Sequence, residues 1–444
     1  MPVSWSIADD SAPGGESSLV EWWLRFDDAL LLRLVREALQ TNTSVNGAEA
    51  ALRQSRSLRD VASAALRPKL SGSASVQRSS GSSAATSGER VTANSFQTGL
   101  DASWELDIFG ANRSALNAAQ ATVRASAAGL GDVQVSIAAE VALTYIALRN
   151  AQARLEIASQ NLSSQQETLQ ITRWRLEAGL ITSLEVEQAR AAVEQTSALL
   201  PALQTGVAQN THALAVLVGS APTALSVLLQ AAAQIPKARE GIALSIPVET
   251  LRKRADVRAA EQQVLAATAR VSQAQAARLP QFTLSGSVGL SALSLGALSS
   301  GSSVVGALLS SIQAPIFDGG AARFQVNAQQ AALDQEVQLY RAAVLTALKD
   351  VEDALAALDG DRLRLAHLND AAQAATNAAL MATQRYNSGL VDFQTVLETQ
   401  RTRLTTQDSV SIALADVGSD HVRLYKALGG GWVADHDFDQ ASTP

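Results

Sequence analysis

The fold is decided by residues 137–169, which read IAAEVALTYIALRNAQARLEIASQNLSSQQETL. Apolar residues recur there at alternating steps of four and three, with Gln165 as the one polar break: Ile137, Val141, Thr144, Leu148, Ala151, Leu155, Ala158, Leu162 and Leu169. This heptad pattern is typical of a helix that packs along its length on other helices. Around it, no proline occurs between Ala111 and Leu200, and only Gly129 and Gly131 interrupt good helix formers. We therefore predict one helix over 111–176, about 100 Å long at 1.5 Å per residue.

The same landmarks occur twice in the chain, about 210 residues apart. Ile108-Phe109-Gly110 is echoed by Ile316-Phe317-Asp318-Gly319, and Arg175 to Ile181 is echoed by Arg385 to Val391. Arg67-Pro68 and Val218-Gly219 have their echoes in Leu279-Pro280 and Leu428-Gly429. A period this long indicates a duplicated large unit rather than a solenoid repeat. Each copy is predicted to run helix, hairpin, very long helix, turn, helix.

Each long helix has a predicted stop and a predicted return. Gly179 and Gly389 stand where a helix needs a left-handed C-terminal residue. Thr182 and Glu185 form a capping-box pattern, and Asp392 is a suitable N-cap. Returning helices are expected over 183–217 and 393–428, and a further half-helix over 28–66 is expected to stack end to end with the first of them.

Between these helical segments the period changes from helical to two. Apolar and polar residues alternate over 96–107 and 281–290, which suits tilted strands that cross a bilayer. The Ser- and Gly-rich connections Ser79–Ser95 and Ser291–Ser303 are expected to be exposed loops. A soluble amphipathic hairpin on a helical core has the same alternation. Four strands cannot close a barrel in lipid, however, whereas three chains would supply twelve.

Composition narrows the possible functions. Hydrophobic residues make up 47% and aromatic residues 4%, so alanine-rich, thin helical packing is favoured. The net charge of −7 argues against nucleic acid as a partner. The chain has no cysteine. We expect no membrane-spanning helix, because no run of about 18 apolar residues is present. Met1 to Glu16 has no secretory signal pattern, which leaves export to be explained by a trimmed or displaced start.

Chemistry-bearing motifs are absent from the sequence. His212, His367, His421 and His436 are widely spaced, and we expect them to be solvent-facing or incidental. There is no phosphate-binding loop with its lysine and no nucleophile elbow. The protein is therefore expected to be no enzyme and to need no cofactor or metal. A soluble structural coiled-coil protein is the competing class, although it would have no use for the alternating segments.

Three stretches together resemble the TolC-like outer membrane factors, in particular the efflux lipoprotein subfamily: residues 104–110, residues 254–261 leading to Leu279-Pro280, and Arg385-Tyr386 with Gly389. The resemblance implies a homotrimer whose long antiparallel coiled-coil α-helical barrel is continued by a twelve-stranded β-barrel, four strands per chain. It implies an exit duct in the outer membrane of a Gram-negative bacterium, in contact with outer-membrane lipids, a periplasmic adaptor and an inner-membrane efflux pump. Such a duct passively conducts small molecules such as drugs. The outer component of a type I protein secretion system shares this architecture. The sequence departs from the subfamily in lacking the lipid-bearing cysteine and in reading Arg254-Ala255-Asp256 where Arg-Pro-Asp is usual.

The resemblance also implies site residues. Thr395 and Glu398 match positions that face the tunnel axis, so three Glu398 carboxylates would form a periplasmic gate that prefers cations. The equivalent residue in the first copy is Gln188. Arg385 and Tyr386 match tip positions that latch neighbouring helices, although packing alone is an equal interpretation. Trp104, on the apolar side of its strand, suits a membrane-interface belt.

In chain order the sequence predicts nine segments. They are an N-terminal tail (1–21), the first helices of repeat 1 (22–67), its membrane hairpin (68–107), its long and returning helices (108–219), an equatorial linker (220–247), the first helix of repeat 2 (248–279), its membrane hairpin (280–317), its long and returning helices (318–428) and a C-terminal tail (429–444).

Overall fold

The computed structural model describes residues 20–82, 90–239, 248–299 and 304–432. The described residues fall into two compact units. Unit 1 lies within Met1–Ala50, Ala128–Arg258 and Ala342–Pro444, and unit 2 within Ala51–Ala127 and Ala259–Arg341. Each unit therefore combines segments from both halves of the sequence.

One order of elements occurs twice, which confirms the predicted duplication. The first copy contains η1 (Trp22–Phe26), α2 (Ala29–Thr41), α3 (Thr43–Ala64), β1 (Lys69–Ser82), β2 (Arg90–Leu106), α4 (Ala111–Glu177), α5 (Ser183–Ser197) and α6 (Leu199–Leu217). The second contains η3 (Val248–Lys253), α7 (Ala255–Ala276), β3 (Gln281–Ala292), η4 (Gly296–Ser299), β4 (Val304–Gln313), α8 (Ala321–Asn387) and α9 (Phe393–Ala427). Both α4 and α8 have 67 residues.

The long helix α4 confirms the helix predicted over 111–176. By length and composition, α4 contains a segment apolar enough to cross a membrane, and half of that segment is buried within the protein. The expectation that no such helix exists is therefore wrong by this criterion. Alanine explains why this helix is apolar and yet packed inside the protein. Ala138 and Ala142 add to its hydropathy, and because they are small they let neighbouring helices approach closely. Both residues are fully buried.

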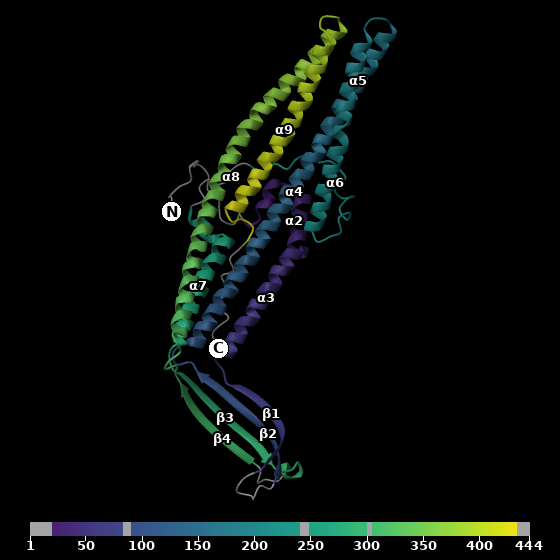
Figure 1. Cartoon of the computed structure of the whole chain (residues 1–444). Helices are drawn as coiled ribbons and strands as arrows, with labels where there is room; N and C mark the ends of the chain where they lie inside the picture. The colour runs from purple at the N-terminus through teal and green to yellow at the C-terminus, as the bar shows by residue number, and fades with distance from the viewer. Residues whose placement is uncertain (1–19, 83–89, 240–247, 300–303, 433–444) are drawn as a thin grey trace. The chain divides into compact units, whose positions relative to one another are not determined.

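Unit 2 contains one four-stranded antiparallel sheet in the order β1-β2-β3-β4. Figure 1 shows the strands side by side, with β1 and β4 at the two edges. The register brings Val76 opposite Phe96, Leu100 opposite Val288, and Phe282 opposite Ile312. Since side chains alternate between faces along a strand, these residues share one apolar face. Asp101 and its partner Ser287 lie on the opposite face.

The predicted loops Ser79–Ser95 and Ser291–Ser303 are too long. Residues 79–82 and 90–95 pair with each other in β1 and β2, and β3 continues to Ala292. Residues 83–89 and 300–303 lie outside the described residues. The ladder is made by backbone groups, so antiparallel pairing extends from Arg78–Asn94 to Ser82–Arg90, beyond the strand ends that the side-chain pattern predicts.

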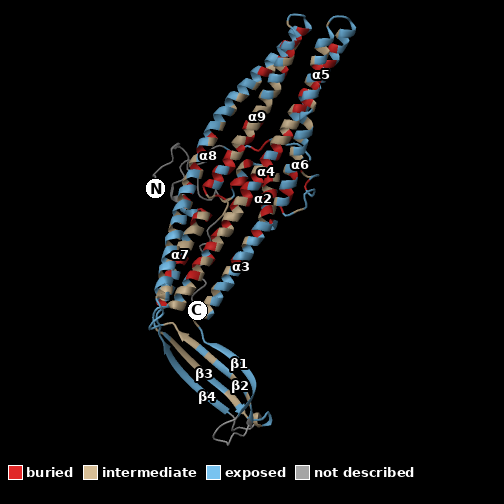
Figure 2. Cartoon of the chain, viewed as in Figure 1, coloured by how far each residue is buried: buried red, intermediate tan, exposed pale blue. Residues whose placement is uncertain are grey.

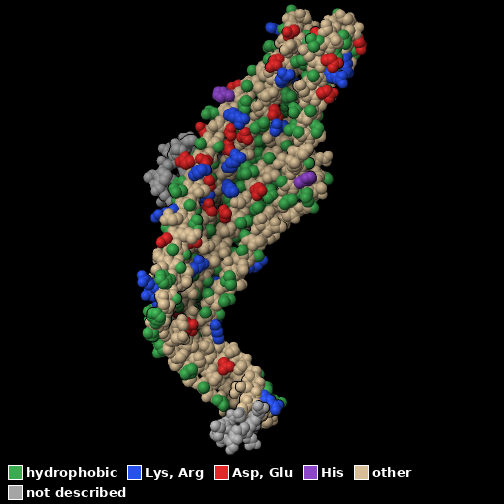
Figure 3. Space-filling view, in the orientation of Figure 1, with side chains coloured by type: hydrophobic (Ala, Val, Ile, Leu, Met, Phe, Trp, Pro, Cys, Tyr) green, Lys and Arg blue, Asp and Glu red, His purple; other side chains and the backbone are tan. Residues whose placement is uncertain are grey.

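The edge strand β4 departs from the alternation of the other three strands. Its sequence is VVGALLSSIQ, and all ten residues are exposed in the single chain. Val305 and Leu309 point to the same face as Asp101 and Ser287, while Leu308 and Ile312 point to the other. β4 is therefore apolar on both faces. Neither β3 nor β4 contains a charged residue, and Figure 3 shows few charged side chains over the sheet.

The core of unit 1 lies where α2, α4, α6 and α9 meet, and Figure 2 shows its buried residues in contrast to the largely exposed strands. Trp22 is fully buried and stacks on Tyr425 with 5.5 Å between ring centroids. The largest fully buried side chains beside them include Leu31, Leu34, Tyr145, Leu148 and Leu214.

Short helices are joined end to end at two equivalent junctions in unit 1. The half-helix predicted over 28–66 is wrong in its continuity, because it is interrupted at Asn42 between α2 and α3, where it meets the end of α6. In the first copy, Asn42 Nδ2 donates to Leu217 O at 2.8 Å, and Thr41 Oγ1 donates to Val218 O at 2.8 Å. In the second copy, Arg254 Nη1 donates to Ala427 O at 2.7 Å. Each contact satisfies a carbonyl that a helix C-terminus leaves without an intrahelical donor.

The two returning helices differ in continuity. The second is continuous as α9, whereas the helix predicted over 183–217 is interrupted at Ala198 between α5 and α6. Pro201 lies in the first turn of α6, where its missing N–H group is tolerated. A single continuous helix would instead need a donor at Pro201 to bond the carbonyl four residues earlier.

The end of the described chain explains one of the two helix-weakening glycines in α4. Trp432 Nε1 donates to Lys253 O at 3.1 Å. A Cβ atom at Gly131 would lie 2.6 Å from the indole ring of Trp432. Gly131 therefore leaves the space in which the segment after α9 lies across α4.

Candidate functional site

The tips of the two helical hairpins in unit 1 are built from the predicted glycine turns. Gly179 and Gly389 have φ values of 71° and 73°. Leu180 N donates to Arg175 O, and Leu390 N donates to Arg385 O, each at 2.9 Å. These bonds close the last turns of α4 and α8, as expected for left-handed C-terminal caps.

The returning helices begin with the predicted caps. Glu185 Oε2 accepts from Thr182 N at 2.7 Å, which completes the capping box at the start of α5. Asp392 Oδ1 accepts from Thr395 N at 2.9 Å and from Thr395 Oγ1 at 2.6 Å. These bonds from the backbone and side chain of Thr395 hold the pKa of Asp392 below its ordinary value.

A small apolar cluster holds the tips together. Its members come from α4, α5, α8 and α9: Leu169, Ala189, Val193, Ala382, Tyr386, Phe393 and Val396. Tyr386 and Phe393 lie 5.3 Å apart between ring centroids. Residues from both sequence copies thus share one core at the tip.

The predicted latch residues have different surroundings. Tyr386 is buried in the apolar cluster, whereas Arg385 is exposed. The guanidinium over the Tyr386 ring is that of Arg175, 4.6 Å from the ring centroid. Arg175 Nη2 also donates to Asn387 Oδ1 at 3.2 Å. Arg175 is the first-copy counterpart of Arg385. The offset between the two copies could therefore have identified Arg175 from the sequence.

The predicted gate residues lie on the first turns of α9. Glu398 is exposed, and its Oε2 lies 3.5 Å from Arg401 Nη1. Thr395 is also exposed and supports the Asp392 cap. A single chain contains no trimer axis, so the carboxylate ring stays a prediction.

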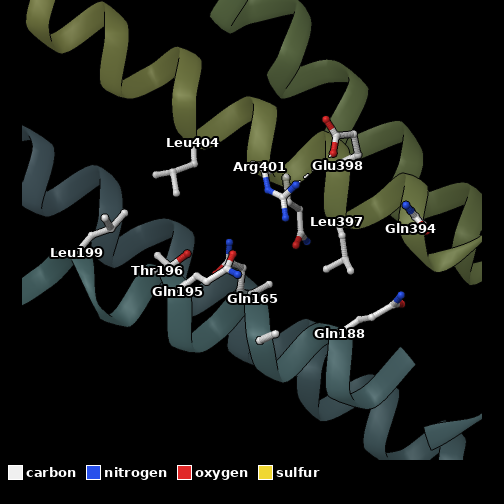
Figure 4. Close-up of a pocket in the computed structure, with 13 residues that line it drawn as sticks. Gln165, Gln188, Gln195, Thr196, Leu199, Gln394, Leu397, Glu398, Arg401 and Leu404 are labelled. Carbon is white, nitrogen blue, oxygen red and sulfur yellow. Dashed lines mark ion pairs between the residues drawn. The ribbon is translucent and has the colours of Figure 1, made fainter. Parts of the chain in front are cut away.

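A cavity of about 410 Å³ lies between the two hairpins. Figure 4 shows Gln165, Gln188 and Thr196 on one side and Glu398, Leu397 and Arg401 on the other. Gln188 and Glu398 occupy equivalent positions in the two sequence copies, and both line this one cavity. The duplication thus places a neutral amide and a carboxylate around the same space.

A second group of charged residues surrounds the second junction in unit 1. Arg254 donates to both carboxylate oxygens of Asp256, at 3.0 and 2.8 Å, and to Asp350 Oδ2 at 3.2 Å. Although burial acts against it, the hydrogen bonds and charge of Arg254 hold the pKa of Asp256 below its ordinary value. Sequence reasoning treated Arg254-Ala255-Asp256 as a family motif, and the structure gives both charged residues a role in joining helices.

Two further ionisable groups are buried nearby on α9. Burial, together with the neighbouring Asp361 carboxyl, raises the pKa of Asp420 to about 6, although Arg423 acts in the opposite direction. Burial, followed by the charge of Arg362, lowers the pKa of His421 to about 4. Of the two expected alternatives, solvent-facing or incidental, the first is wrong for His421, because α9 packs in the core at this position. His212 and His367 are exposed, and His436 lies outside the described residues.

Trp104 lies near the end of β2 on the apolar face of the sheet. Its indole Nε1 donates to Leu66 O at 3.0 Å. Its side chain is half-buried, with the ring on the face shared by its strand partner Leu284. The side chain thus combines an apolar ring with an N–H group that has a hydrogen-bond partner. This combination suits a residue at a membrane–water interface.

Comparisons by sequence and by structure both find outer membrane proteins. The sequence model of the outer membrane efflux protein family matches residues 34–220 and 246–430. The toluene efflux pump outer membrane protein TtgF of Pseudomonas putida is 30% identical over 414 residues, which are 93% of this chain and 86% of the relative. The pyoverdine export outer membrane protein OpmQ of Pseudomonas aeruginosa is 32% identical over 431 residues, which cover 94% and 89% of the two chains.

Solved structures resemble the chain over nearly its whole length. The outer-membrane channel OprN has a TM-score of 0.90 and 32% sequence identity, and the match covers 97% of both chains. The outer membrane protein VceC of Vibrio cholerae has a TM-score of 0.85 and 28% identity, over 93% of this chain and 99% of that one.

Proposed function

The chain belongs to the outer membrane efflux protein family, and from this premise we propose that three copies form the exit duct of a tripartite efflux system. The protein is an outer-membrane efflux channel, and its family is one of transport components. In the proposal, the hairpins of 68–107 and 280–317 cross the outer membrane, and the helices of 108–219 and 318–428 extend into the periplasm. The remaining segments keep the roles predicted for them from the sequence.

The observation that supports the trimer best is the sheet of unit 2. It has two free edges, β1 and β4, and an apolar face that runs across all four strands. A free edge in lipid leaves unpaired backbone groups, each at a cost of several kcal/mol. Pairing β4 of one copy with β1 of the next removes every free edge when the ring closes. Three copies then give twelve strands, which is wide enough for a water-filled lumen.

Exported compounds would pass along the polar face of the sheet, which lines the lumen in this arrangement. The relatives named for toluene efflux and pyoverdine export support small molecules as the cargo class. A passive duct needs an energy source elsewhere, so a periplasmic adaptor and an inner-membrane pump are its proposed partners. Glu398 is the proposed gate residue, with Thr395 beside it.

Disulfide trapping tests the trimer directly, because the chain has no native cysteine. One cysteine is placed in β1 at Ser75, and a second is moved along β4 through Ala307, Leu309 and Ser311. Oxidation in isolated outer membranes should give a covalent trimer for at least one pair. Each single-cysteine variant is the control and should remain monomeric in denaturing gels. If no pair gives more than a monomer while the sheet is intact, the closed ring is wrong.

A further inference from the structure

The polar face of the sheet in unit 2 carries its charges in one narrow band. Among the described strand residues, the charged side chains on this face are Lys69 on β1 and Asp101 and Glu105 on β2. β3 and β4 contribute none. Lys69 is opposite Ser103, the residue midway between the two acidic ones. Since every second residue of a strand points to the same face, the lysine lies between the two carboxylates along this face.

No close partner cancels these charges. Within the described chain, no ion pair joins Lys69 to Asp101 or Glu105. Asp101 Oδ2 accepts from Ser73 Oγ at 3.1 Å, which links the carboxylate to β1 without neutralising it. Lys69 and Asp101 are exposed, and Glu105 is half-buried. Charges in this condition act on mobile ions in the water beside them.

The polar face is neutral on the far side of this band. From Asp101 toward the Ser- and Gly-rich connections, the described residues of this face are Ser, Gln, Gly, Ala and Val. One lysine against two carboxylates gives the band a net charge of −1 per chain. The excess negative charge of this face is therefore concentrated in three neighbouring rows of the sheet.

We propose that Asp101, Glu105 and Lys69 form a charge filter in the lumen of the membrane-spanning sheet, an inference that rests on the proposed trimer. Three chains related by rotation place each residue in a ring at one height. The three rings together carry a net charge of −3, because each chain contributes −1. Rings of carboxylates raise the local concentration of cations and oppose the entry of anions. The filter therefore favours cationic over anionic cargo, and Lys69 weakens this preference.

This filter is separate from the proposed gate. Asp101, Glu105 and Lys69 lie in unit 2, whereas Glu398 lies in unit 1. Cargo would meet the two sets of carboxylates at different points of the duct. Each set can therefore be neutralised while the other is left unchanged.

The test measures the reversal potential of the full chain in planar bilayers across a KCl gradient. Asp101→Asn and Glu105→Gln should each shift it toward zero, the value for a pore without preference. Lys69→Gln should shift it in the opposite direction, toward stronger cation preference, which a damaged pore would not do. Arg78→Gln removes the same charge from the same strand, but on the apolar face, and should equal the wild type. The shifts should shrink at high salt, because the Debye length falls from about 10 Å at 0.1 M to about 3 Å at 1 M.

Cysteine chemistry tests the same position without a change of the fold, because the chain has no native cysteine. In Asp101→Cys, a methanethiosulfonate reagent with a sulfonate group should restore the cation preference, and one with a trimethylammonium group should reverse it. Ala102→Cys, on the apolar face, is the control and should respond to neither reagent.

The outcomes separate the filter from the trimer. If the wild type forms pores and Asp101→Asn, Glu105→Gln and Lys69→Gln all keep its reversal potential, the filter is wrong and the trimer stands. If Arg78→Gln shifts the potential as much as Lys69→Gln does, the two faces are assigned wrongly and the filter is again wrong. If the wild type forms no pore, the trimer and the filter are both wrong.

Discussion

The two copies of the repeat have the same fold but differ in charge at equivalent positions. Asn42 at the first junction corresponds to Arg254 at the second, Asn210 on α6 to Asp420 on α9, and Gln188 to Glu398. In each pair the first copy has a neutral amide and the second an ionised or ionisable group. The fold that the two copies share therefore does not require a charged side chain at these three positions. We infer that the second copy combines its structural role with sensitivity to pH and ions.

The largest expected effect is at the second junction. Arg254→Met removes the donor to Ala427 O and leaves Asp256 and Asp350 without their cation. Losing one partner of a largely buried pair costs about 3 kcal/mol. Asn42→Ala, at the first junction, should cost about 1 kcal/mol, since only neutral hydrogen bonds are lost. Urea unfolding of both variants measures the difference, and Arg239→Met, in an exposed ion pair, is the control. Equal losses at the two junctions would refute the distinction.

The junction glycines provide the next comparison. Gly219 has a φ of 68°, and a Cβ there would lie 2.6 Å from Thr41 O, a backbone atom. Gly429 has a φ of 77°, and its nearest neighbour would be Arg254 Cγ at 2.9 Å. Because the backbone at Gly219 is left-handed and the clash is with a rigid carbonyl, Gly219→Ala should lower the free energy of unfolding by about 2 kcal/mol. Gly429→Ala should cost about as much, because the guanidinium of Arg254 is held by Ala427 and Asp256 and the backbone Cα of Arg254 would lie 3.2 Å from the new Cβ. Thermal unfolding of the two variants measures both losses, and a much smaller loss in Gly429→Ala would show that the second junction is the more adaptable one.

At the paired positions Asn210 and Asp420, only the second copy has a group that titrates. The pKa of Asp420 is raised from 3.8 to about 6 in the folded protein, so the folded state binds a proton more tightly than the unfolded state. The contribution of this group to stability is therefore full below pH 4 and is lost as the pH rises toward 6. Asp420→Asn, which restores the amide of the first copy, should remove this part of the pH dependence. Unfolding free energies at pH 4, 5, 6 and 7 check it. Asn210→Asp is the converse variant and should introduce a pH dependence.

The smallest structural change concerns Glu398. Glu398→Gln gives the second copy the residue of the first and should reduce cation preference in planar bilayers, because three carboxylates near one axis would be lost. Gln188→Glu should increase that preference if its side chain faces the same lumen. The measurement is the reversal potential across a salt gradient. An unchanged value in Glu398→Gln would place this carboxylate away from the axis.

Much of the fold follows from local sequence signals. The heptad steps from Ile137 to Leu169, the glycines at 179 and 389 and the caps at Thr182 and Asp392 each depend on a few neighbouring residues, and each is found in the structure. The strand ends were harder to predict, because backbone pairing continues through serine-rich sequence where side chains give no signal.

The site was less predictable because its features depend on tertiary contacts. The guanidinium over Tyr386 belongs to Arg175 from the other copy, and only the packing of the two tips brings them together. Gln165 was visible only as a break in the heptad pattern. Its burial beside Gln400, and the cavity that both line, come from helices that lie far apart in the sequence.

The edge strand β4 has a consequence for the time before assembly. Residues 304–309 read VVGALL, with no charge and no proline, and they stand exposed beside a free backbone edge. Segments of this composition on a free edge are prone to self-association into β aggregates. If β4 pairs with another copy as proposed, a newly made chain faces two competing reactions of its β4 edge: ordered pairing with that copy, and disordered aggregation. Both become faster as the concentration of chains rises, so concentration alone does not favour the ordered product. We therefore expect selective assembly to require that β4 stays covered until the chain reaches a lipid environment.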